Sequence, residues 1–195
     1  MNNGKKLAEI FRKESVPFDP AIVARGMKDG LAGGKTLLTD QEAQAVVDAV
    51  RNDMIKKAQA AGKKEGDDFL AANKSKDGVV PLPSGLQYKI LKAGTGPKPM
   101  ANDTVVCNYR GTLINGQEFD SSYKRGQPAK FAVTGVIKGW TEALQLMPVG
   151  SKWQLFIPSD LAYGEGGNQG IPPSSTLIFE VELLSIEGGD KDQKK

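Results

Sequence analysis

The stretch that decides the fold runs Leu177-Ile178-Phe179-Glu180-Val181-Glu182-Leu183. Every second residue in it is apolar, and glutamates stand at two of the positions between. Successive side chains of a β-strand point to opposite faces of the sheet, so this period of two predicts a strand with one buried face. The same period recurs upstream in residues 86–90, 105–110 and 153–157. The second half of the chain is therefore expected to form a β-sheet.

Turn signals and one short helix complete this half. Asn115-Gly116 is a strong hairpin signal, and it joins the strand near residues 105–110 to a short strand that ends at Phe119. One short helix fits from about Lys138 to Leu146. Near the start of the half, the pattern places Leu86, Tyr88 and Ile90 on the apolar face of a strand. About five antiparallel strands around one short helix predict an α+β domain, whose half-wrapped sheet leaves a cleft at its open end.

The first half is polar and rich in helix-forming residues. Apolar spacing predicts a first helix over about residues 3–15. Asp19-Pro20 supplies a capping residue and a proline at the first helical position, which starts a second helix. Thr39-Asp40-Gln41-Glu42 has the capping-box pattern that starts a third helix. Gly62 and Gly66 each cost about 1 kcal/mol relative to alanine, so this helix is expected to have a weak middle.

Prolines and glycines between residues 75 and 84 prevent the third helix from continuing. We therefore expect four parts, which are a helical domain at 1–74 with a long helix at about 40–73, a linker at 75–84, a sheet domain at 85–187 and a tail at 188–195. The tail has no apolar residue to bury and is expected to be disordered.

The composition excludes several classes of function. The chain contains no histidine, which excludes Ser-His-Asp and Cys-His nucleophiles and all histidine-ligated metal sites. Cys107 is the single cysteine, which excludes CxxC redox chemistry, thiolate zinc clusters and a disulfide within one chain. No metal and no cofactor are expected. A net charge of +3 does not indicate nucleic acid, and no apolar run reaches the length of about 18 residues that a membrane span needs.

Aromatic residues spread through the second half indicate a binding pocket. Taken singly, each of them is typical of a protein core. Together with Asp120, and with tyrosine hydroxyls but no catalytic base, they describe a pocket that binds an apolar group and offers a few hydrogen bonds. The glycine-rich loop 164–170 suggests a phosphate site as an alternative, but it lacks the GK[ST] ending and a following helix.

Five blocks of the second half resemble the FKBP family, the macrolide-binding peptidyl-prolyl isomerases. In chain order they are Tyr109–Leu113, Gly116–Ser122, Val136–Trp140, Ile157–Gly164 and Gly170–Leu183. The first half resembles the bacterial Mip-like and FkpA-like subgroup, at Arg25–Leu31, Leu37–Thr39 and Leu82–Tyr88. In that subgroup a helical dimerisation domain is followed by a long helix that carries the catalytic domain.

The resemblance implies a peptidyl-prolyl cis-trans isomerase that acts in protein folding, with chaperone activity. It implies that Trp140 lies under the substrate proline ring, and that the backbone N–H of Ile137 and the hydroxyl of Tyr163 bind ligand carbonyls. Asp120 would lie near the isomerising carbonyl, with Arg125 beside it. The catalytic residues it implies are Asp120, Tyr163, Tyr109, Phe119 and Trp140. The implied binding residues are these five with Arg125, Phe131, Val136, Ile137, Ile171 and Phe179.

The partners implied are unfolded or partly folded proteins that contain proline, and macrolide inhibitors. A non-catalytic chaperone or scaffold that only holds proline-containing chains is the alternative function. A homodimer through about residues 1–38 is expected, because two short helices carry more apolar surface than they can bury between them and a second copy can cover it.

The location expected from the resemblance is the periplasm, with outer-membrane association included. The first residues, Met1 to Lys5, show no targeting sequence, so the cytoplasm is the alternative. Our hypothesis is that the sequence is a mature or trimmed form of an exported precursor.

Overall fold

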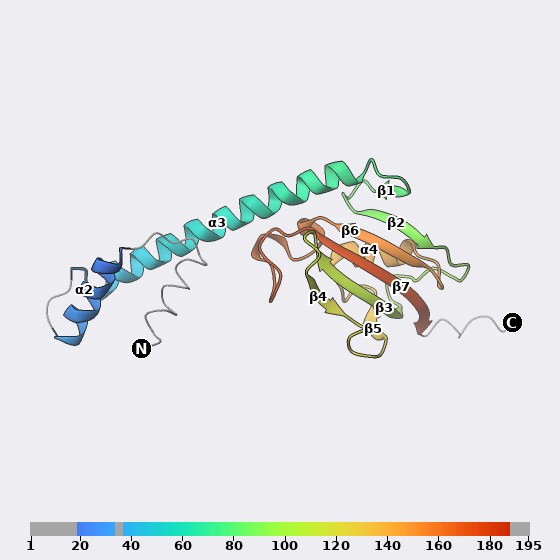
Figure 1. Ribbon diagram of the computed structural model, residues 1–195. Coiled ribbons are helices and arrows are strands. Elements are labelled where there is room, and N and C mark those ends of the chain that lie inside the picture. The colour runs from blue at the N-terminus through green and yellow to red at the C-terminus, as the bar shows by residue number, and fades with distance from the viewer. Residues whose placement is uncertain (1–18, 34–36, 188–195) are drawn as a thin grey trace. The chain divides into compact units, whose positions relative to one another are not determined.

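The computed structural model describes residues 19–33 and 37–187 (Figure 1). The contacts within the chain define two compact units, Met1–Asn52 and Asp53–Lys195. The division falls inside the long helix α3, Asp40–Asn73, and not in the predicted linker at 75–84. The reason is that the second half of α3 packs against the sheet domain. The predicted domain limits remain predictions about which parts fold independently.

The helix starts in the first unit follow the sequence signals. Helix α2 spans Pro20–Leu31, and the Asp19 carboxylate accepts a hydrogen bond from the N–H of Ala21 at 2.8 Å. At the start of α3, Glu42 accepts from the N–H of Thr39 at 2.8 Å and the Thr39 hydroxyl accepts from the N–H of Glu42 at 3.3 Å. This reciprocal pair confirms the capping box. The predicted helix at 3–15 and the predicted tail at 188–195 lie outside the described residues.

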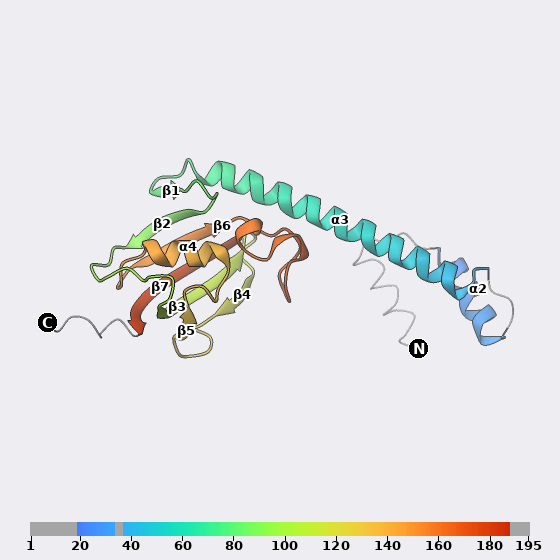
Figure 2. The same cartoon turned by 180° about the vertical axis from the view of Figure 1, so that it is seen from behind.

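The second unit contains an antiparallel sheet of seven strands in the order β1-β2-β6-β7-β3-β4, with β5 paired to β3. Figure 2 shows the short helix α4, Lys138–Leu146, lying across one face of this sheet. The α+β prediction is confirmed, and the sheet has two strands more than predicted. The strands are β1 Val79–Pro81, β2 Gln87–Lys92, β3 Thr104–Leu113, β4 Glu118–Ser121, β5 Ala129–Ala132, β6 Lys152–Ile157 and β7 Leu177–Glu187.

The core lies between the sheet and α4. Leu177, Phe179, Val181 and Leu183 on β7 are all buried, as the period of two predicts. Trp140, Ala143 and Leu144 of α4 pack onto this face. None of the helices in the described part of the chain is both long enough and apolar enough to cross a membrane.

Strand β2 departs from the predicted alternation. Ile90 is 48% exposed, whereas the polar Gln87 is 5% exposed. The Gln87 side-chain amide donates to the carbonyl of Leu70 at 2.9 Å and accepts from the amide of Asn73 at 3.0 Å. The end of α3 therefore covers this strand and satisfies its buried polar group. Ile90 lies on the opposite face, paired with the buried Trp153 as the alternation predicts, but this end of β2 is incompletely covered, so Ile90 is exposed rather than buried.

Candidate functional site

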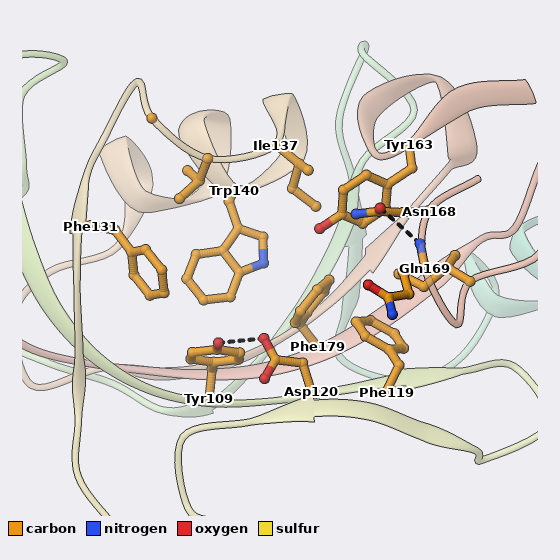
Figure 3. Close-up of a pocket in the computed structure, with 13 residues that line it drawn as sticks. Tyr109, Phe119, Asp120, Phe131, Ile137, Trp140, Tyr163, Asn168, Gln169 and Phe179 are labelled. Carbon is orange, nitrogen blue, oxygen red and sulfur yellow. Dashed lines mark hydrogen bonds between the residues drawn. The ribbon is translucent and has the colours of Figure 1, made fainter. Parts of the chain in front are cut away.

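A pocket of about 620 Å³ opens on the α4 side of the sheet in the second unit (Figure 3). Its size lies within the range of about 300–1,000 Å³ typical of ligand sites. Strands β3, β4, β5 and β7, the start of α4 and the loop before β7 all contribute to it. The predicted site residues that line it are Tyr109, Phe119, Asp120, Phe131, Val136, Ile137, Trp140, Tyr163, Ile171 and Phe179.

Trp140 forms the centre of an aromatic cluster. Its ring meets Tyr109 nearly edge-on at a centroid distance of 5.3 Å, Phe179 at 5.3 Å and Phe131 at 5.6 Å. Such edge-to-face pairs are favourable beyond the area they bury, so the rings hold one another in place. Gly139 precedes Trp140, and a Cβ there would lie 2.5 Å from Cγ2 of Ile157. The glycine therefore lets α4 approach β6 closely, which seats Trp140 against the sheet.

Asp120 lies at one side of the pocket in a hydrogen-bonded network of three residues. The Tyr109 hydroxyl donates to one carboxylate oxygen at 2.5 Å, and the Arg125 guanidinium donates to the other. The same guanidinium donates to the Tyr109 hydroxyl at 2.5 Å and lies over the Tyr109 ring, 5.3 Å from its centroid. Arg125 does not line the pocket; it contacts the two residues that do. The network thus fixes the orientation of the carboxylate, which Figure 3 shows turned toward the Tyr109 hydroxyl at the wall of the cavity.

The network also fixes the charges in the pocket. Burial alone would raise the pKa of Asp120, but hydrogen bonds from Tyr109 and Arg125 and the guanidinium charge outweigh it and hold the pKa below its ordinary value. The pKa of Tyr109 is raised, first by burial and then by its hydrogen bond to the carboxylate. At neutral pH the pocket therefore holds an ionised carboxylate beside a protonated phenol.

The loop before β7 forms another side of the pocket, and we call it the 163–176 loop. Figure 3 shows Tyr163, Asn168 and Gln169 on this side, facing the aromatic cluster. Tyr163 is 37% exposed, and Figure 3 shows its hydroxyl pointing toward the interior of the pocket. The sequence interpretation included Tyr163 and Ile171 but missed Asn168, Gln169 and, next to Val136, Gly135. Two predicted site residues flank residues 164–170, and that signal could have assigned the loop to the pocket.

Cys107 takes no part in this site. Its thiol is buried on β3, and burial raises its pKa to about 12. It is therefore neutral and inaccessible in the folded protein.

Two family descriptions match the chain, one for each half. Residues 96–184 match the FKBP-type peptidyl-prolyl cis-trans isomerase family, and residues 1–90 match the domain amino-terminal to FKBP-type peptidyl-prolyl isomerase. The "Outer membrane protein MIP" of Legionella longbeachae is 48% identical over 192 residues, which cover 94% of this chain and 82% of that protein. The chain belongs to the FKBP family.

Other relatives match this FKBP over most of its length. The "FKBP-type 22 kDa peptidyl-prolyl cis-trans isomerase" of Escherichia coli is 51% identical over 191 residues, covering 94% of this chain and 89% of that one. The crystal structure of FkpA from Escherichia coli superposes with a TM-score of 0.78 at 37% identity, covering 94% of this chain and 90% of that one. The predicted enzyme class, peptidyl-prolyl cis-trans isomerase, and the Mip-like and FkpA-like subgroup are thereby confirmed.

Proposed function

We propose that the pocket around Trp140 is the isomerase site and that it works by shape and desolvation. Rotation about an X-Pro bond meets a barrier of roughly 20 kcal/mol because it breaks amide resonance, and it makes or breaks no covalent bond. The planar amide is more dipolar than the twisted one. A dry aromatic pocket therefore disfavours the planar state relative to the twisted one. The observation that carries the proposal is the closed ring cluster of Trp140, Tyr109, Phe131 and Phe179.

In this proposal the proline ring rests on Trp140, and two donors hold the substrate carbonyls. Ile137 stands at the N-cap of α4, where backbone N–H groups have no partner inside the helix. The hydroxyl of Tyr163 faces the same space from the 163–176 loop. Asp120 presents an ionised carboxylate to the isomerising amide, and Tyr109 and Arg125 fix its orientation.

The rate of cis-to-trans conversion of a short X-Pro peptide tests this proposal. We expect Asp120→Leu to lower kcat/KM about tenfold, which corresponds to about 1.4 kcal/mol of transition-state stabilisation. Tyr163→Phe should lower it while leaving the fold intact. Glu118→Leu is the matched control, because Glu118 lies on the same strand, pairs with Arg110 and Lys124, and does not line the pocket. Full activity of Asp120→Leu would show that the assignment is wrong.

The same pocket should bind macrolides of the rapamycin type and proline-containing segments of unfolded proteins. A macrolide should inhibit peptide turnover competitively, and failure to inhibit at high concentration would count against the pocket. A chaperone that only held proline would bind the peptide in this assay without accelerating its isomerisation.

We also propose a homodimer through about residues 1–38. In the described part of the first unit, apolar side chains lie open, since Ile22 is 62%, Met27 60% and Leu31 89% exposed. A second copy of the same patch would cover them in the simplest two-fold arrangement. Two isomerase units in one dimer would hold an unfolded chain at two points, which raises the effective concentration at the second site and supports a chaperone role.

Light scattering tests the dimer. A full-length chain that weighs 20.9 kDa at micromolar concentration would be a monomer and would refute it. The refolding rate of a proline-containing protein, compared between the wild type and a monomeric variant such as Leu31→Glu, tests whether the two sites of a dimer hold one unfolded chain together.

Export to the periplasm, with association to the outer membrane, is our proposal for the location. It rests on the printed name of the Legionella relative, an outer membrane protein. Fractionation of the native host would find the protein in the periplasmic or outer-membrane fraction, and recovery in the cytoplasmic fraction would refute the proposal.

A further inference from the structure

The second half of α3 presents one narrow stripe to the rest of the second unit. Residues three or four apart on a helix lie on the same face, and the contacts follow this spacing. The stripe consists of Gln59, Gly62, Gly66, Phe69, Leu70 and Asn73. Phe69, Leu70 and Asn73 contact β2 and β6. Gln59, Gly62 and Gly66 contact the 163–176 loop.

The two glycines let the helix approach the loop to backbone contact. A Cβ at Gly62 would lie 2.5 Å from the carbonyl oxygen of Pro173, and a Cβ at Gly66 would collide with the hydroxyl of Thr176. Helix α3 continues without a break through both positions. Each glycine costs the helix about 1 kcal/mol relative to alanine, and the contact with the loop offsets this cost.

A hydrogen bond fixes the other end of the same loop to the helix. The side-chain amide of Gln59 donates to the carbonyl oxygen of Glu165 at 3.0 Å. The helix therefore contacts the 163–176 loop on both sides of Asn168, Gln169 and Ile171, which line the pocket.

The loop itself is closed by backbone hydrogen bonds, so a displacement at its ends reaches its centre. The N–H of Ser174 donates to the carbonyl of Gly164 at 3.0 Å, which ties its two ends together. Asn168 and Ile171 exchange two backbone hydrogen bonds at 3.0 and 2.8 Å. One side of this closed loop meets α3, and the other side carries Tyr163, Asn168, Gln169 and Ile171 in the pocket wall.

We propose that Gln59, Gly62 and Gly66 are positioning residues for the isomerase reaction, because they hold the 163–176 loop where it forms one wall of the substrate pocket. They touch no substrate themselves. The pocket wall then depends on the second half of α3, although this helix belongs to the amino-terminal half of the sequence. The inference rests on the proposed isomerase site, and it predicts that the helix affects substrate binding more than turnover.

Gly62→Ala in the full-length chain is the first test. The added methyl group has to displace the backbone at Pro173, so KM for a short X-Pro peptide should rise about fivefold, the equivalent of about 1 kcal/mol, with kcat nearly unchanged. Hydrogen exchange of the Asn168 and Ile171 amides should become faster. Ala60→Ser is the matched control, because it also adds one heavy atom to α3 but on its exposed face, and it should change neither value.

A second pair of variants separates positioning from a general loss of stability. Gly66→Ala should raise KM, and adding Thr176→Ala should restore it, because the second change removes the hydroxyl that the new methyl group meets. A general loss of stability would not be restored in this way. Gln59→Ala leaves the helix-to-loop packing untouched and should raise KM about twofold, so it remains informative if a glycine variant folds poorly.

The outcomes distinguish this inference from the proposed site. Unchanged KM and unchanged amide exchange in Gly62→Ala and Gly66→Ala would overturn the positioning role. Faster amide exchange in those variants, combined with full activity of Asp120→Leu, would support the contact between helix and loop but place the isomerase site elsewhere.

Discussion

Gly111→Ala introduces one methyl group behind the pocket wall. Gly111 on β3 is paired with Phe179 on the neighbouring strand β7. A Cβ at Gly111 would lie 2.7 Å from a ring carbon of Phe119 and 2.7 Å from a ring carbon of Phe179. Ordinary contact begins near 3.4 Å, so the rings have to retreat by about 0.7 Å, the difference between the two distances. Phe179 is 5% exposed and packed on Trp140, whereas Phe119 is only partly buried. We therefore expect Phe119 to move into the pocket.

The magnitude follows from the cost of overpacking. An extra methyl group in a packed core costs about 1–3 kcal/mol of unfolding free energy. For a chain of this size each kcal/mol lowers Tm by about 2–4 °C. Because the displaced ring narrows the substrate pocket, kcat/KM for a short X-Pro peptide should fall about tenfold.

Chemical denaturation and the peptide assay check both values. Adding Phe119→Leu removes one of the two colliding rings and should recover part of the lost stability but not the activity, since Phe119 also lines the pocket. If Gly111→Ala unfolds at the same denaturant concentration as the wild type and turns over peptide at the same rate, the two rings do not pack on Gly111 and the derived pocket wall is wrong.

Three further predictions follow from the core and from the charged groups. Phe179→Ala should lower the unfolding free energy by about 3–5 kcal/mol in a denaturant titration, because it removes a buried ring from the cluster; a loss below 1 kcal/mol would contradict its place in the core. The kcat/KM profile should be flat from about pH 5 to 9, since the chain has no histidine and the pKa of Asp120 is lowered. The stabilisation by the Asp120 network is present above the ordinary carboxyl pKa of about 3.9 and is lost only as the pH falls through the lower folded pKa. A midpoint of the kcat/KM profile near about pH 6 or 7 would contradict this prediction. Cys107, whose folded pKa is about 12, should resist alkylation at pH 8 until the protein is unfolded, as mass spectrometry would show; rapid native alkylation would mean that β3 is open.

Local signals predicted the elements that depend on neighbouring residues. The capping box at Thr39 and Glu42 and the proline start of α2 are properties of a few adjacent residues, and both are present in the structure. The same holds for α4, whose limits Lys138 and Leu146 match the prediction. The alternation of β7 identified its buried face, because both of its neighbours in the sheet present the same side to α4.

Contacts between distant segments explain the failures. Gln87 is buried because Leu70 and Asn73 satisfy its amide, and no pattern within β2 contains that information. Gly62 and Gly66 were interpreted as weak points of a helix, because the loop that requires them lies more than a hundred residues further along the chain. The short strand β1 lies inside the segment predicted as a linker, where pairing with β2 overrides the proline at its end.

The individual pocket residues were predicted from the sequence blocks that resemble the FKBP family. Composition alone indicated only the chemical kind of the pocket. Aromatic residues without histidine indicated an apolar pocket that works without a nucleophile. Asn168 and Gln169 escaped this reasoning because polar residues in a glycine-rich loop are also typical of an exposed turn.

The central claim is that the proline ring of the substrate rests on Trp140 while the X-Pro bond rotates. Nuclear Overhauser contacts between a labelled X-Pro peptide in catalysed exchange and the two tryptophans test it directly. Trp153 is the internal control, because it stacks on Tyr88 at 4.3 Å and does not line the pocket. We predict contacts from the proline ring to the indole of Trp140 and none to Trp153. Peptide that exchanges between cis and trans at the catalysed rate without contacting Trp140 would contradict the proposed site.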